Sequence, residues 1–210
     1  MEKRNWKHIV TLKQRMVLCL AAFFAAFALQ LALNGYQARA VQQVQDDQMG
    51  NFNAISRFQG GVESSISILE AYRWENGETE EMLEKLQAAC STSNAWLWRI
   101  RSNMDGLQNV SDEQWVLYGA VETTYGSYNT LLEELESYLS SGQEAKASQL
   151  YYNKVSVCGG YLSQYTMQLL KASILDAQTT YTEISELGER IALMQTVVVA
   201  LCVALGCASG

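Results

Sequence analysis

The sequence contains no proline, and this absence favours long helices over a loop-rich fold. Proline breaks helix interiors and is common in turns and loops. A chain of 210 residues without it is expected to form a few long helices joined by short turns. The fold class that we predict is therefore all-α.

Histidine is almost as scarce, and its position excludes several kinds of catalytic site. The only histidine is His8, in the N-terminal tail. Nucleophilic sites of the Ser-His-Asp or Cys-His type need a histidine base, and di-iron helical bundles need Glu-x-x-His pairs. The sequence also has no phosphate-binding loop, dinucleotide fingerprint or kinase signature. We therefore expect no catalytic residue, no metal site and no cofactor here, although the full-length parent protein could be a histidine kinase.

Positive charge is scarce outside the N-terminal segment. Residues 1–35 carry five basic residues and one acid, whereas residues 36–190 carry 21 acids and 10 lysines and arginines. Nucleic-acid binding needs a basic face, so we expect no nucleic-acid partner. The acid excess is explained by the solubility that net charge gives a domain.

Two long apolar runs predict two transmembrane helices. Residues 16–33 contain one strongly polar residue, Gln30. At ~1.5 Å per residue this run spans about 27 Å, close to the hydrocarbon thickness of a bilayer. A second apolar run covers residues 191–210. We predict a first transmembrane helix at residues 16–35, a second at 191–210, and the lipid bilayer as a partner.

The basic residues predict the orientation of the first span. The five that precede it are Lys3, Arg4, Lys7, Lys13 and Arg15. Because cytoplasmic flanks are enriched in lysine and arginine, residues 1–15 are expected to be a cytoplasmic basic tail and residues 36–190 an extracytoplasmic domain. No basic residue follows the second span, which predicts that an output domain follows residue 210.

A cleavable signal peptide is the alternative for the first apolar run. Residues 38–40, Ala-Arg-Ala, resemble a cleavage site. The run is nevertheless longer than the apolar region of a signal peptide, which has roughly 7–15 residues, and a second apolar run exists. An uncleaved anchor is therefore favoured.

Between the spans, apolar residues recur at alternating steps of three and four, which is typical of packed helices. Turn and capping residues separate four stretches: Asn76-Gly77, a capping box at residues 111–114, and residues 140–142. We predict helices at 36–75, 79–105, 111–140 and 143–190, forming an antiparallel up-down four-helix bundle. The apolar stripe of the fourth helix is expected to shift phase from Leu169 to Leu170 and Ile174. The first and fourth helices are longer than the middle pair, so we expect them to extend as a two-helix neck.

Glycines recur at one predicted height of the bundle, and they have two interpretations. They are Gly60, Gly61, Gly126, Gly159 and Gly160. Glycine costs about 1 kcal/mol in a helix interior, so a cluster needs a reason. The first interpretation is close helix packing or a hinge. The second is a ligand pocket at this level, lined by Arg57, Asn94, Trp98, Tyr125, Tyr128 and Tyr161. Aromatic walls and one cation would suit a small anionic or aromatic ligand, although tyrosines at heptad positions also fit an ordinary core.

Two cysteines, Cys90 and Cys158, fall in the predicted bundle. Their helices should be diagonal in an up-down arrangement, and a disulfide needs Cα atoms within about 7 Å. Buried core thiols are therefore favoured over a disulfide bridge.

The order of these parts resembles the sensor region of bacterial transmembrane receptors, specifically two-component histidine kinases and methyl-accepting chemoreceptors. The resemblance covers the whole chain and rests on the basic tail, the spans and the helical region between them, without a short motif. It implies a homodimer in the bacterial plasma membrane that senses a small-molecule or protein ligand outside the cytoplasm. The signal would pass through the second transmembrane helix to a kinase or a chemoreceptor signalling hairpin.

We thus expect the input module of a membrane receptor, with a two-component histidine kinase as the first hypothesis and a chemoreceptor as the second. A membrane-tethered helical scaffold that binds a protein partner is the alternative from a different class.

Overall fold

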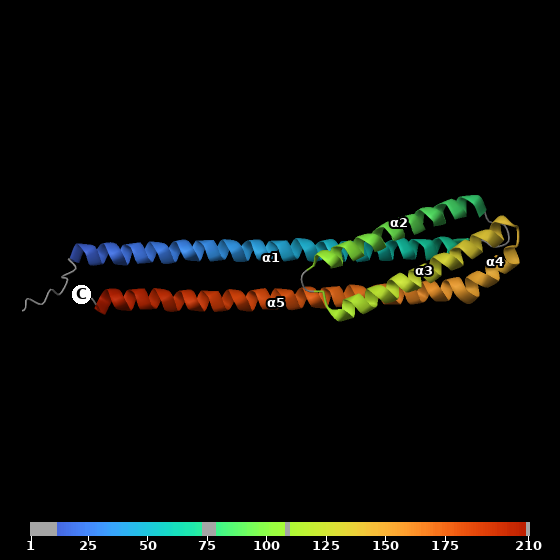
Figure 1. The fold of residues 1–210 in the computed structure, drawn as a ribbon. Coiled ribbons are helices and arrows are strands. Elements are labelled where there is room, and N and C mark those ends of the chain that lie inside the picture. Colours follow the sequence, from blue (N-terminus) through green and yellow to red (C-terminus); the bar gives the residue numbers. More distant parts are fainter. Residues whose placement is uncertain (1–11, 73–78, 108–109, 209–210) are drawn as a thin grey trace, which may run out of the picture. The chain divides into compact units, whose positions relative to one another are not determined.

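The computed structural model describes residues 12–72, 79–107 and 110–208, and these residues are helical apart from short connections (Figure 1). The elements are α1 (Leu12–Ala71), α2 (Thr79–Gly106), α3 (Asp112–Ser140), α4 (Glu144–Leu150), the π-helix η1 (Tyr151–Val155) and α5 (Ser156–Ala208). The chain divides into two compact units, residues 44–180 and residues 1–43 with 181–210. Helices α1 and α5 contribute residues to both units. The predicted all-α fold is confirmed.

The ends of α3 follow from the residues found there. At its start, Ser111 Oγ accepts a hydrogen bond from the backbone N–H of Gln114 at 3.2 Å, which is one half of the predicted capping box. At its end, Gly142 has a φ of +71°, and the N–H of Gln143 donates to the carbonyl of Tyr138 at 2.8 Å. This left-handed glycine closes the helix and reverses the chain. The predicted Asn76-Gly77 turn lies outside the described residues.

In the unit of residues 44–180, four helices pack against one another: α1, α2, α3, and α4 with η1 and the first part of α5. Two contacts for each pair of neighbouring helices show whether the helices run parallel or antiparallel. Helices α1 and α2 meet at Gly61–Ser93, with Tyr72–Thr79 at their connected ends, and α2 and α3 meet at Cys90–Tyr125 and Gln87–Glu136. Helices α3 and α5 meet at Tyr128–Gly159, with Ser111–Asp176 at the start of α3, and α1 and α5 meet at Ile66–Gly159 and Asn51–Ser173. In each pair, rising numbers on one helix meet falling numbers on the other, so these neighbours are antiparallel.

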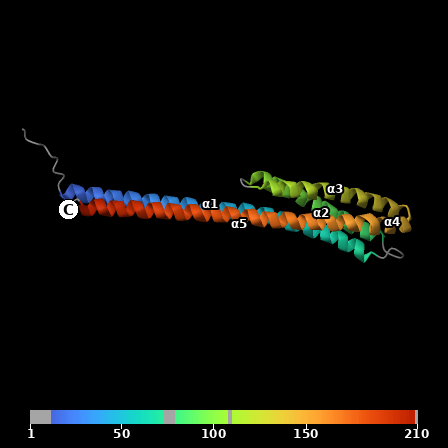
Figure 2. The same ribbon diagram turned by 90° about the horizontal axis from the view of Figure 1, so that it is seen from below.

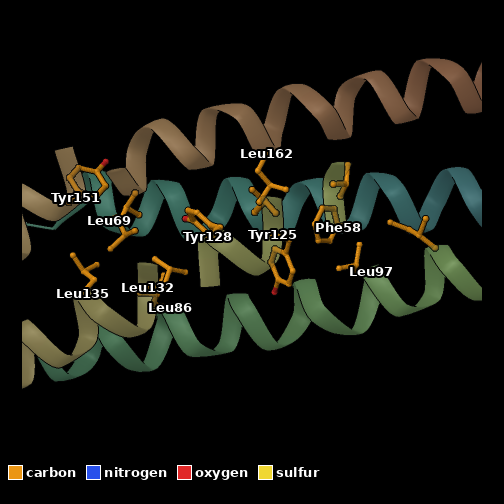
Figure 3. Packing of buried hydrophobic residues seen from close by; sticks show 14 of the residues in the cluster. Phe58, Leu69, Leu86, Leu97, Tyr125, Tyr128, Leu132, Leu135, Tyr151 and Leu162 are labelled. Carbon is orange, nitrogen blue, oxygen red and sulfur yellow. The ribbon is translucent and has the colours of Figure 1, made fainter. Parts of the chain in front are cut away.

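The core of this unit is built mainly from aliphatic and tyrosine side chains (Figure 3). Phe58 packs edge-on against Tyr125, with 5.3 Å between the ring centroids. Tyr128 is fully buried and donates a hydrogen bond to Ser65 Oγ at 3.0 Å, because the Ser65 hydroxyl itself donates to the Val62 carbonyl. A buried tyrosine needs such a partner for its hydroxyl, so these residues fix the register of α1 against α3.

The π-helix η1 is explained by the spacing of buried residues. Ala147, Tyr151, Val155 and Gly159 are buried at successive steps of four. An α-helix has about 3.6 residues per turn, so three steps of four overshoot three turns by about one residue. A single π turn absorbs one extra residue. The buried side of the fourth helix is thereby kept continuous. Figure 2 shows α4 and α5 following one another along one helical rod.

The predicted phase shift at Leu170 is wrong. Ile174 is exposed, whereas Ala172 and Ser173 are buried and continue the stripe from Leu169. The reason is that the core is polar at this level: Asn51 is fully buried and its Nδ2 donates to Ser173 Oγ at 3.3 Å. Antiparallel register places the buried Gln114 at the same height, opposite Ser173. An apolar pattern cannot identify a polar layer.

The other unit pairs residues up to 43 of α1 with residues from 181 of α5. Gly188 faces the side chain of Gln37 so closely that a Cβ atom there would overlap the amide nitrogen. Arg190 and Glu186 form an ion pair at 4.0 Å along α5. Across the described part of the chain, none of the helices combines the length and apolar character needed to cross a membrane. Most of the predicted basic tail, residues 1–11, lies outside the described residues.

Candidate functional site

A groove of about 460 Å³ lies between α2 and α3. Helix α2 lines it with Leu83, Leu86, Gln87, Cys90, Ser91 and Asn94, and α3 lines it with Tyr125, Asn129, Leu132, Glu133 and Glu136. On each helix these residues follow steps of three and four, so they form facing stripes. The groove therefore has both apolar walls and polar groups, the combination found in small-molecule sites.

Hydrogen bonds hold several polar groups of the groove in place. The Tyr125 hydroxyl donates to the carbonyl oxygen of Cys90 at 2.8 Å, which links α3 to α2 (Figure 3). Gln87 Nε2 donates to Glu136 Oε1 at 2.9 Å and links the same helices nearer to the turn that follows α3. The buried oxygen Oδ1 of Asn129 has no hydrogen-bond partner. One acceptor in the groove is thus left for water or a ligand.

Two groups in the groove, Cys90 and Tyr125, have pKa values shifted toward their neutral forms. Burial, together with the negative charge of Glu136, raises the pKa of the Cys90 thiol to about 11. Burial raises the pKa of Tyr125 to about 12, against the opposing effect of hydrogen bonding with Asn129 and Ser93. At neutral pH both groups are uncharged, so Cys90 is a poor nucleophile. The groove is therefore suited to binding rather than to thiol chemistry.

Three of the six predicted ligand-binding residues, Asn94, Tyr125 and Tyr128, lie on α2 and α3, the two helices that form the groove. Asn94 and Tyr125 line the groove. Tyr128 is in the core instead, where it contacts Ser65 and Gly159. The structure thus brings two of the predicted residues together in one cavity and uses the third for packing.

The other three predicted residues, Arg57, Trp98 and Tyr161, are not among the residues that line the groove. The Arg57 guanidinium lies over the Trp96 ring, 5.6 Å from the ring centroid, and its Nε donates to Asn53 at 3.4 Å. Trp98 is 71% exposed and Tyr161 is 55% exposed. The cation that was expected in the pocket is therefore engaged with Trp96 and Asn53.

The predicted glycine cluster contains two different kinds of position. A Cβ atom at Gly61 would overlap Ser93 Oγ, and one at Gly159 would lie 3.1 Å from Ile66 and 3.3 Å from Tyr128. At Gly60, Gly126 and Gly160 a Cβ atom would meet nothing within 4 Å. Gly61 and Gly159 thus allow close helix packing, and the other three have no packing role in this chain's own bundle.

Cys90 and Cys158 are free thiols, and both are half-buried at the edge of the core rather than fully buried as predicted. Cys158 Sγ donates to the Thr124 carbonyl at 3.7 Å. In the described residues, no group of three or more histidine, cysteine or acidic side chains is arranged to hold a metal ion.

Sequence reasoning missed the acidic and amide residues of the groove, Glu133, Glu136 and Asn129. They flank the buried heptad positions of α3, where a charged residue is expected to be an ordinary solvated one. A usable signal was present in part: Gln87 and Glu136 lie at matching heights on helices predicted to be neighbours, which identifies a polar strip between them.

Comparison of the chain with protein-family models, with curated protein sequences and with solved structures found no match.

Proposed function

We propose that this chain is the extracytoplasmic signal-sensing input module of a bacterial membrane receptor, a homodimeric two-component histidine kinase. The bundle of residues 44–180 receives the signal, and α5 passes it through the second transmembrane segment to an output domain. The observation that carries the proposal is the exposure of large apolar side chains on both helices of the other unit.

On α1, Phe23, Phe24, Leu29 and Leu31 are each more than half exposed. On α5, Leu193 and Met194 are each about two-thirds exposed. Exposed apolar surface of this extent marks contact with a partner or a membrane. Both sets fall within the apolar runs predicted to span the bilayer, and the exposure of adjacent residues such as Phe23 and Phe24 is what a lipid environment would favour.

The bundle supports the part of the proposal that concerns signal reception. It contains a groove with polar groups, and α1 and α5, which enter the bundle, also carry the apolar segments. A change in the packing of α5 against α1 is thus a route by which a signal reaches the second span. Shifts of about 1–2 Å between packed helices are sufficient in known switching proteins.

A disulfide that locks α1 to α5 tests this function. Residues 1–210 are joined to the cytoplasmic kinase region of a sensor kinase that lacks its own input region. All native cysteines are replaced, and Asn51→Cys and Ser173→Cys are introduced at the hydrogen-bonded pair. We expect oxidation to change autophosphorylation in isolated membranes severalfold and reduction to restore it.

The two single-cysteine variants are the controls, and neither should respond to oxidation. If the double variant forms its disulfide in full and the kinase rate does not change, packing of α5 against α1 does not control output, and the input-module proposal is wrong.

A further inference from the structure

The groove between α2 and α3 carries negative charge and no positive charge. Its lining includes the carboxylates of Glu133 and Glu136, and no lysine or arginine is among its lining residues. The anionic ligand expected from the sequence depended on Arg57, which lies over Trp96 instead. An anion in the groove would face two like charges without a counter-charge.

Two hydrogen-bond donors of the groove are already engaged, whereas acceptors are left for a ligand. Tyr125 and Gln87 direct donors to the Cys90 carbonyl and to Glu136. The buried Asn129 Oδ1 has no partner, and Glu133 adds an exposed carboxylate one turn along α3. A ligand that donates several hydrogen bonds would satisfy these acceptors. An ammonium group offers three donors and a positive charge.

Part of the groove is aliphatic. Leu83 and Leu86 of α2 and Leu132 of α3 are among its lining residues, and Figure 3 shows Leu86 and Leu132 near each other between the two helices. Methylene groups that lie against these side chains would leave water, which favours binding. A ligand that carries cations at its ends and a short hydrocarbon body therefore matches both parts of the lining.

We infer that the α2–α3 groove binds a short aliphatic diamine, with its ammonium groups at the carboxylates of Glu133 and Glu136 and its methylene body against the leucines. One ammonium group also donates to Asn129 Oδ1. The ligand thus contacts both helices, α3 through its ammonium groups and α2 through its methylene body, and changes how both pack on α1 and α5. This inference rests on the proposed sensor function for its biological meaning, but the binding itself requires only the bundle.

The probe is 1,5-diaminopentane, and its matched controls are 1,5-pentanediol and glutarate, which have the same number of carbons but no charge or two negative charges. Binding to the full chain in a mild detergent is measured by isothermal titration calorimetry and by the shift in thermal unfolding. We expect saturable binding and a higher unfolding temperature with the diamine alone.

Three variants locate the site. Glu133→Gln and Glu136→Gln remove one carboxylate of the groove each, and each should weaken diamine binding about tenfold or more. Glu134→Gln makes the same change of charge on the same helix outside the groove, and it should leave the affinity unchanged. Circular dichroism of each variant shows that its helical content is kept.

Equal affinity in all three variants would mean that the diamine is a non-specific counter-ion, and the inference would be wrong. Binding of glutarate in place of the diamine, or of no probe to the folded chain, would also overturn it. These outcomes leave the disulfide test untouched, so loss of the ligand class and loss of the receptor function can be told apart.

Discussion

Close packing at single residues determines which glycines of the bundle are required. Gly61 contacts Ser93 of α2, whereas its neighbour Gly60 faces open space. At both positions glycine is less favourable in a helix than alanine by about 1 kcal/mol. The two positions therefore form a matched pair in which helix propensity is the same and packing differs.

We expect Gly60→Ala to raise the free energy of unfolding by about 1 kcal/mol through helix propensity. Gly61→Ala should raise it less or lower it, because the added methyl group overlaps Ser93 Oγ, which must give up its hydrogen bond to the Ala89 carbonyl to move away. Chemical unfolding followed by circular dichroism measures both. Equal stabilisation by the two variants would show that α1 and α2 are not in close contact at this level.

The buried thiol of Cys90 makes stability depend on alkaline pH. Its pKa is raised from 9 to about 11, so above pH 9 the unfolded chain loses a proton that the folded chain keeps. This contribution to stability is complete below pH 9 and is lost as pH rises toward 11. Tyr125 and Tyr118, with pKa values raised to about 12, act in the same direction at higher pH.

We therefore expect the unfolding temperature to fall between pH 9 and pH 11, and to fall less steeply in Cys90→Ala. The comparison uses the slope, because the substitution also changes stability at neutral pH. Parallel curves for the two proteins would contradict the burial of this thiol.

At the scale of single elements, the π turn η1 keeps the buried residues before and after it on the same side of the fourth helix of the bundle. The π turn accommodates one residue more than an α-helical turn would. A deletion inside η1 should thus restore an α-helix and keep the buried stripes on both sides aligned. A deletion in regular helix should rotate everything beyond it by about 100°.

We expect deletion of the exposed Asn153 to preserve the cooperative unfolding transition. Deletion of Gln164, which is exposed in the regular part of α5, should abolish it. Thermal unfolding by circular dichroism distinguishes the two. Loss of the transition in both variants would mean that residues 151–155 are required as a π turn.

The two helices of the other unit also have a defined register. The Gly188–Gln37 contact places Gln30 and Gln195, each seven residues further along antiparallel helices, at one level. Both are half-buried, and the amide nitrogen of Gln195 has no partner. If these segments span a membrane as proposed, amide side chains at one level can hydrogen-bond across the helices, with about 0.6–2 kcal/mol for such pairs. We expect the two glutamines to pair there.

Cysteine cross-linking tests this level. In a chain without native cysteines, Gln30→Cys with Gln195→Cys should form a disulfide on mild oxidation, detected by mass spectrometry of peptides. Leu29→Cys with Gln195→Cys is the control, because Leu29 is 60% exposed, and it should not cross-link. If only the control pair cross-linked, the face of α1 that contacts α5 would be the one that carries Leu29, and the expected pairing of Gln30 with Gln195 would be wrong.

At the scale of the whole molecule, the sequence was a good guide to elements and a poorer guide to sites. The lack of proline and the heptad steps predicted the helices, and capping residues placed the start and end of α3 within a residue. The polar layer of Asn51 and Ser173 could not be predicted, because an apolar pattern is blind to buried hydrogen-bonded residues. The contact of Arg57 with Trp96 could not be predicted, because helical spacing does not tell which neighbour a long side chain reaches.

The central claim is that a bundle outside the cytoplasm is held by two membrane-spanning segments. The most direct measurement is labelling of single cysteines by a membrane-impermeant maleimide in intact cells, in a chain whose native cysteines are replaced. Ser141→Cys, in the turn after α3, should be labelled without cell lysis, and Lys3→Cys should be labelled only after lysis. Labelling of both positions only after lysis, with the chain recovered in the soluble fraction, would contradict the claim.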